Sequence, residues 1–142
     1  MSTIPTVAQV NVGDAIPGRT IHIDRPKLVE YAAASLDRNR IHWDEPFAKK
    51  MGLPTVIAHG MYTMGAVGTV VADWAGDAGR VVQYSTRFTG MVPVEYDTGA
   101  DVEVSGEVIA VDLDSKRATV ELTVTHNGAK VLGKCQAVVQ LD

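Results

Sequence analysis

The sequence predicts an α+β domain in which a curved antiparallel sheet wraps around one long central helix. Four segments in the C-terminal half alternate apolar with polar residues, and the last three are joined by short turn sequences. One helical segment, residues 58–77, is apolar or small on every face. A helix of that kind is expected to be buried, and a sheet with one apolar face can cover it.

The composition limits the classes of protein that need to be considered. With 142 residues, we expect one domain over 1–142 that buries its core without staples. A net charge of −4 without a block of like charges argues against a nucleic-acid or anionic-membrane partner. The lone cysteine, Cys135, excludes an internal disulfide, and the N-terminus lacks the pattern of a signal peptide. We therefore expect a cytoplasmic protein.

The N-terminal half predicts one strand and two helices. "RTIHID" alternates like a short strand, and Asp24 is an N-cap candidate for a helix over 25–35, with proline two residues later. "DEPFAKKMG" predicts a second, short helix that ends at Gly52. The segment between the two helices is polar and predicts a loop.

The central helix is predicted to be buried on all sides. Its large apolar residues recur at helical spacing, at Met61, Met64, Val67, Val71 and Trp74. Glycines inside the helix, such as Gly65 and Gly68, each cost about 1 kcal/mol relative to alanine. We therefore expect neighbouring groups to press closely against this backbone.

The C-terminal half predicts four strands of an antiparallel sheet. Asn127 and Gly128 form a strong hairpin turn signal, and "DLDSK" predicts the preceding hairpin. The apolar parity switches near Ile109, Val111 and Leu113, which predicts a bulge. The residues expected to face the helix are Val82, Tyr84, Thr86, Phe88, Val102, Val104, Val108, Ala118, Val120, Leu122, Val124, Val131, Cys135, Ala137, Val139 and Leu141.

The loop "SLDRNRIHWDEPFA", residues 35–48, spaces a carboxylate, an amide and an imidazole as Asp37, Asn39 and His42. Together with "TVIAHGMYTMG" at the start of the central helix and "YSTRFTGMVPVEYD" after it, this loop resembles the hydratase motif of the MaoC-like family of (R)-specific enoyl-thioester hydratases and dehydratases. The resemblance includes the short dehydratase subunits of mycobacterial-type fatty-acid elongation. It implies the hot-dog fold. Two residues depart from the family pattern, Leu36 in place of glycine and Arg40 in place of proline.

The resemblance implies reversible hydration of a trans-2-enoyl thioester to an (R)-3-hydroxyacyl thioester, carried on coenzyme A or acyl carrier protein. Asp37 and His42 would hold one water and move its protons, and Asn39 would orient the loop or the water. The backbone N–H of Gly60, at the start of the buried helix, would stabilise the enolate oxygen. No metal or organic cofactor is expected.

The open edges of the predicted sheet, with the resemblance, imply a homodimer or a heterodimer with a related hot-dog subunit. Two alternative functions remain open: a hot-dog acyl thioesterase, and a non-catalytic partner subunit of a heterodimeric dehydratase. An Asp-x-Asn turn taken alone is usually only a turn. His59 is interpreted as structural and Cys135 as a core thiol, while Arg87 could meet a partner, a phosphate or only water.

Overall fold

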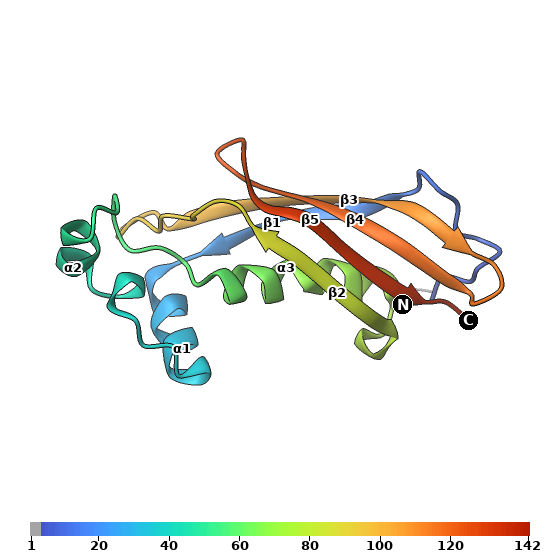
Figure 1. Ribbon diagram of the computed structural model, residues 1–142, viewed down its shortest axis with the longest axis horizontal. Coiled ribbons are helices and arrows are strands. Elements are labelled where there is room, and N and C mark those ends of the chain that lie inside the picture. Colours follow the sequence, from blue (N-terminus) through green and yellow to red (C-terminus); the bar gives the residue numbers. More distant parts are fainter. Residues whose placement is uncertain (1–3) are drawn as a thin grey trace.

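The computed structural model describes residues 4–142, which form one sheet and three α-helices (Figure 1). The sheet has the strand order β1-β3-β4-β5-β2, and every neighbouring pair is antiparallel. The strands are β1 (Ala15–Ile23), β2 (Val81–Phe88), β3 (Ala100–Asp112), β4 (Arg117–His126) and β5 (Ala129–Gln140). The helices are α1 (Arg25–Ser35), α2 (Glu45–Lys50) and α3 (Gly60–Ala75), with short 3₁₀ turns η1 (Arg40–His42) and η2 (Ala78–Arg80).

The predicted α+β architecture is confirmed. Figure 1 shows α3 running along one face of the curved sheet, with α1 and α2 gathered at one end of the molecule. The helix starts follow local signals, since Asp24 and Asp44 each accept a hydrogen bond from the backbone N–H three residues later, at 3.0 and 3.2 Å. Gly52, just beyond α2, has the positive φ of +88° that favours glycine.

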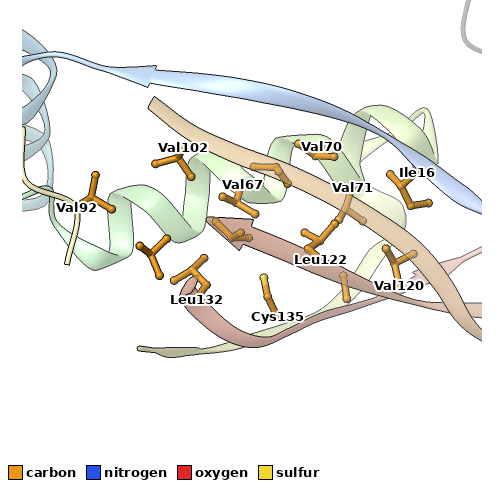
Figure 2. Close-up of a cluster of buried hydrophobic side chains, with 14 of the residues drawn as sticks. Ile16, Val67, Val70, Val71, Val92, Val102, Val120, Leu122, Leu132 and Cys135 are labelled. Atoms are coloured by element: carbon orange, nitrogen blue, oxygen red, sulfur yellow. The ribbon is translucent and has the colours of Figure 1, made fainter. Parts of the chain in front are cut away.

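The core lies between α3 and the sheet (Figure 2). Val67, Val70 and Val71 of α3 are buried against apolar side chains of the strands. The strand residues Val102, Val120, Leu122, Cys135 and Val139 are at most 3% exposed, as their alternation predicts. The bulge is also confirmed, because the register of β3 with β4 shifts between Val108 and Ala110.

The prediction that α3 is buried on every side is wrong for the single chain. Met61, Gly65, Thr69 and Asp73 form an exposed stripe at i, i+4 spacing, and Met61 is 59% exposed. The close approach expected at the glycines occurs at Gly68, where a Cβ would lie 3.0 Å from the Tyr84 ring, but not at Gly65. Apolar composition alone therefore did not reveal which side of α3 the sheet leaves open.

Strand β2 departs from its predicted alternation. It lies at an edge of the sheet, and its register against β5 shifts twice, so Val82 and Phe88 are 46% and 54% exposed instead of facing the core. Tyr84 does face inward, and its hydroxyl donates to the carbonyl of Met64 at 2.6 Å. The shifts leave Phe88 at the end of β2 beside the start of α3.

Candidate active site

A cavity of about 560 Å³ opens at the N-terminal end of α3. It collects side chains from α1, from the loop after it, from the start of α3 and from the end of β2. Its lining includes Tyr31, Ser35, Asp37, His42, Ile57, His59, Gly60, Met61, Phe88 and Met91. Three of the predicted site residues, Asp37, His42 and Gly60, therefore meet in one cavity, while Asn39 is not among the lining residues.

The end of α1 sets the position of Asp37. Leu36, the C-cap, has φ 64° and ψ 9°, a left-handed conformation that glycine adopts more easily. The Ser35 hydroxyl donates to the carbonyl of Tyr31 at 2.7 Å and accepts from the N–H of Asp37 at 3.2 Å. Leu36 therefore stands, where the family pattern has glycine, in a conformation that strains a residue with a side chain.

The side chain and the backbone N–H of Asn39 both make hydrogen bonds within the loop. The carboxylate Oδ1 of Asp37 accepts from the N–H of Asn39 at 3.2 Å, and Oδ1 of Asn39 accepts from the N–H of Ile41 at 3.2 Å. Asn39 is thus the N-cap of η1, the turn that presents His42. Of the two roles predicted for its amide, the contacts are those of loop orientation.

Arg40, which stands where the family has proline, is tied to Asp44. Its Nε and one Nη donate to a single carboxylate oxygen of Asp44 at 3.0 and 2.7 Å, and its guanidinium lies 4.3 Å from the centre of the Phe47 ring. These hydrogen bonds hold the pKa of Asp44 below its usual value. Proline would fix this turn through its ring, whereas Arg40 ties the turn to the start of α2.

The backbone around Ile57 fixes His42. The N–H of Ile57 donates to the carbonyl of Ile41 at 3.1 Å, and Nδ1 of His42 donates to the carbonyl of Ile57 at 2.7 Å. Flanking hydrogen bonds from Ala58 to Val92 and from Val94 to Val56 hold this segment in place. Because a carbonyl can only accept, Nδ1 carries the proton, and Nε2 of the neutral ring is left as an acceptor.

His42 is 7% exposed, and burial lowers its pKa below the usual value. The nearby His59 adds to this lowering, while the Ile57 carbonyl and the Asp37 charge oppose it. His42 is therefore held in its neutral form at neutral pH. Its Nε2 lies 3.9 Å from Oδ2 of Asp37, which is too far for a direct hydrogen bond.

This separation has a chemical meaning. The Asp37 carboxylate and neutral Nε2 are both acceptors, so they do not bond to each other, but one water can donate to both. Such a water would lie beside two groups that can take its proton. Two acceptors around one water can carry out acid–base chemistry on it.

Gly60 is the first residue of α3, so its N–H precedes the hydrogen-bonded ladder of the helix and lies at the positive end of the helix dipole. A Cβ at this position would lie 2.9 Å from the Phe88 ring. Glycine therefore lets Phe88 and the start of α3 approach each other. The wall of the cavity includes both residues.

His59 contacts both members of the Asp37–His42 pair. Its ring stacks on that of His42 at 3.7 Å between centroids, and its Nε2 donates to the backbone carbonyl of Asp37 at 3.1 Å. One ligand atom from each of Asp37, His42 and His59 lies within 4.8 Å of the others, a spacing at which a metal ion could be held. His59 is buried, and its Nε2 already donates to the Asp37 carbonyl, whereas Asp37 and His42 line the cavity with Oδ2 and Nε2 free of a direct bond to each other. The expectation that no metal is needed stays a prediction.

The fold and site together define a hot-dog protein whose cavity holds an Asp/His pair beside the start of the central helix. The model of the MaoC like domain matches residues 8–128. The chain therefore belongs to the MaoC-like dehydratase family, and the resemblance stated from the sequence is confirmed.

Known proteins support this placement. The chain is 38% identical over 95 residues to 3-hydroxyacyl-thioester dehydratase X of Mycobacterium tuberculosis, covering 61% of this chain and 33% of that one. It is 32% identical over 111 residues to the 3-hydroxybutyryl-CoA dehydratase of Methylorubrum extorquens, covering 78% and 68%. A solved MaoC-like dehydratase superposes with a TM-score of 0.95 at 37% identity, over 98% of this chain and 43% of the other.

The chain is shorter than several of these relatives. It spans a third of dehydratase X, less than half of the solved chain, and 4% of a fungal fatty acid synthase beta subunit that it also matches. Among residues 4–142, none of the helices combines the length and the apolar character that a membrane crossing requires.

Several lining residues escaped the sequence analysis. Tyr31 and Phe88 line the cavity, yet the sequence placed them only within a predicted helix and on the inner face of a predicted strand. Met61 was expected in the core or in the lining of an acyl tunnel, and it lies exposed at the cavity. Tyr31 and Ser35 stand four residues apart on one face of α1, and this spacing next to Asp37 was the available signal.

Proposed function

We propose that this protein catalyses the reversible hydration of a trans-2-enoyl thioester to an (R)-3-hydroxyacyl thioester. The observation that carries the proposal is the 3.9 Å gap between Oδ2 of Asp37 and Nε2 of His42, two acceptors that face one cavity. A thioester-conjugated double bond needs water delivered to C3 and a proton delivered to C2. A pair that holds one water can serve both needs.

In the hydration direction, the water held by Asp37 and His42 attacks C3 and gives up one proton to the pair. The electrons of the double bond move toward the thioester carbonyl, and the developing enolate oxygen accepts from the N–H of Gly60. The enolate then collapses as C2 takes a proton from the pair. Water has been added across the bond, and dehydration is the same path in reverse.

The substrate class follows from the chemistry of the site and from the relatives. Dehydratase X acts on 3-hydroxyacyl thioesters by its name, and the Methylorubrum relative on 3-hydroxybutyryl-CoA. The cavity is lined by apolar groups beside the polar pair, including Ile57, Met61 and Phe88, which suit an acyl chain next to the reacting carbons. We assign the chain to fatty-acid metabolism, with coenzyme A or acyl carrier protein as the carrier.

A crotonyl thioester tests the proposal directly. Hydration removes the enone absorbance and releases no thiol, so absorbance should fall while a thiol reagent stays unreacted. Release of free thiol instead would identify a hot-dog thioesterase. A chain that is inert alone but active with a related subunit, and equally active with Asp37→Asn, would identify a non-catalytic partner.

Prior treatment with a strong chelator should leave the rate unchanged, because the pair and the Gly60 N–H need no ion.

We further propose that the active form is a homodimer or a heterodimer with a related hot-dog subunit. Strands β1 and β2 are open edges, and Val82 on β2 and the stripe of Met61, Gly65 and Thr69 on α3 are exposed. The solved dehydratase has more than half of its length left over, room for a second unit of this size. Sedimentation at assay concentration should show no active monomer.

A further inference from the structure

We propose that His59 is a positioning residue that sets the distance and orientation of the Asp37–His42 pair. The inference rests on the proposed function and deepens it. The sequence suggested only a structural role for His59, whereas its contacts in the structure point to the pair. In the mechanism above, His59 touches neither the water nor the substrate.

Helix capping does not explain His59. It is the N-cap residue of α3, a position where serine, threonine, aspartate or asparagine normally supplies a side-chain acceptor, yet its side chain makes no cap hydrogen bond. The ring is instead turned away from the helix N–H groups, toward the loop that carries Asp37. A residue selected only to start α3 would not place its ring there.

Packing alone does not explain it either. His59 is 2% exposed, and its Nδ1 is a buried polar atom without a hydrogen-bond partner in residues 4–142. An unpaired buried acceptor destabilises the folded state, because it gives up its hydrogen bonds to water without replacement. Phenylalanine would fill the same space without that penalty. The use of histidine therefore requires something that a ring without a nitrogen cannot supply.

The N–H at Nε2 is that group. It donates to the backbone carbonyl of Asp37 at 3.1 Å, while the face of the same ring stacks on His42 at 3.7 Å with an interplanar angle of 22°. One rigid side chain thus contacts the backbone of Asp37 and the imidazole of His42. Two groups that are bridged in this way cannot drift apart independently, so the 3.9 Å gap that suits a shared water is maintained.

Tyr31 completes the arrangement. Its ring meets that of His59 edge to face, with centroids 4.7 Å apart, and it comes from α1, the helix that leads into Asp37. The ionisable side chains around His42 are thus Asp37 on the loop, His59 at the start of α3 and, behind His59, Tyr31 on α1. Movement of α1, of the loop or of α3 would be felt at the pair through this ring.

The test compares His59→Phe with His59→Gln. Phenylalanine keeps an aromatic ring for stacking and loses the N–H, whereas glutamine restores an N–H donor near the position of Nε2 and loses the ring. We expect kcat for a crotonyl thioester to fall roughly 10- to 100-fold in His59→Phe with little change in KM, because the pair is displaced but the acyl site is not. His59→Gln should recover part of that loss. His126→Gln, at a partly buried histidine outside the cavity, is the matched control and should behave as wild type.

Repeating the substitution in a His42→Ala variant distinguishes a positioning role of His59 from a packing role. If His59 acts through His42, then His59→Phe should have almost no further effect in a His42→Ala chain, where the pair is already broken. Wild-type kcat in His59→Phe, or the same loss from it in both backgrounds, would overturn the proposal. Melting temperatures verify folding, and His59→Gln serves if the phenylalanine variant does not fold.

Imidazole NMR provides a readout that does not depend on turnover. The chain has four histidines, so the His42 signal can be assigned by substitution. His59→Phe keeps the burial of His42 and removes the histidine that helps to lower its pKa, so the pKa of His42 should rise. An unchanged His42 titration would count against the proposal even if the wild-type chain proved inactive on enoyl thioesters, an outcome that would refute the proposed function alone.

Discussion

In the β4–β5 hairpin, side chains are held by packing, whereas in the loop between α1 and α2 they are held by hydrogen bonds. Leu122 and Cys135 face each other across the hairpin and are almost fully buried. In the loop, Asp37 and Asn39 are exposed, and both use their side chains to accept backbone N–H groups. The hairpin contributes stability, and the loop contributes geometry at the cavity. Substitutions in the two regions should therefore change different measurements.

The largest effect is expected at the Asp37–His42 pair. Asp37→Asn removes a proton acceptor and His42→Ala removes the other contact to the shared water, so each should lower kcat by about 10²- to 10⁴-fold. Because both act on one water, the double variant should be little worse than either single one. Turnover of a crotonyl thioester measures all three variants.

Asp37→Asn should still fold normally, because Asp37 is exposed. His42→Ala should melt at a lower temperature, because it removes a buried ring and its hydrogen bond to the Ile57 carbonyl. Thermal melting provides the control, and normal melting is what separates a chemical loss from a structural one. If Asp37→Asn melts normally and keeps most of its activity, the assignment of this pair is wrong.

The hairpin should show the opposite behaviour. Leu122→Ala removes a buried side chain between β3, β5 and α3, and it should lower the free energy of unfolding by about 2–5 kcal/mol. At a temperature where the variant is still folded, kcat should stay close to that of the wild type. Thr123→Ala, on the exposed face of the same strand, should change stability by less than about 0.5 kcal/mol in denaturant titrations. A large loss of kcat in folded Leu122→Ala would mean that hairpin and loop are not independent.

The same contrast explains what could be predicted from the sequence. Alternation in β3, β4 and β5, the Asp24 cap and the Asn127–Gly128 turn are local patterns, and each is confirmed. The identity of Asp37 and His42 as neighbours followed from one motif. Local patterns could not predict the two register shifts of β2 or the open stripe of α3, which depend on what the rest of the chain covers.

The contacts of the site that the sequence did not predict also join residues far apart in the chain. The carbonyl that fixes His42 belongs to Ile57, 15 residues away, and the N–H that reaches Asp37 belongs to His59, 22 residues away. Neither contact is signalled by a periodic pattern in the sequence. Arg40 is different, because its partner Asp44 is four residues later in the chain, and the i, i+4 charge rule could have identified that pair.

A pH profile should separate the loop from the rest of the molecule. Burial lowers the pKa of His42 below its ordinary 6.5, and only the neutral ring can accept from the water. We expect kcat/KM to be constant above about pH 6.5 and to fall as the pH drops through the lowered pKa of His42. Folding stability should follow the same sign, present above 6.5 and lost below, because the unfolded chain binds the proton more readily. Rates measured between pH 5 and 8 provide the test.

This window avoids the other perturbed groups of the loop. Hydrogen bonds hold the pKa of Asp44 below its ordinary 3.8 and that of Glu45 below 4.5, so their contribution to stability is lost only at more acid pH. An acid limb centred above pH 6.5 would contradict the buried, neutral His42.

The smallest expected effect tests the strain at Leu36. A residue with a Cβ at this left-handed φ of 64° costs roughly 1–2 kcal/mol relative to glycine in the folded state. Glycine also makes the unfolded chain more flexible, which offsets part of the stability gained by the substitution. Leu36 is 72% exposed, so little buried surface is lost. Leu36→Gly should therefore raise stability by about 0.5–1 kcal/mol in denaturant titrations, whereas Leu36→Ala, which keeps a Cβ, should not. Since the hydrogen bond from the Asp37 N–H to Ser35 does not involve this side chain, kcat should be unchanged. A lower kcat in Leu36→Gly at normal stability would show that the loop needs the stiffness of leucine to hold Asp37, and the separation between stability and geometry would fail at this residue.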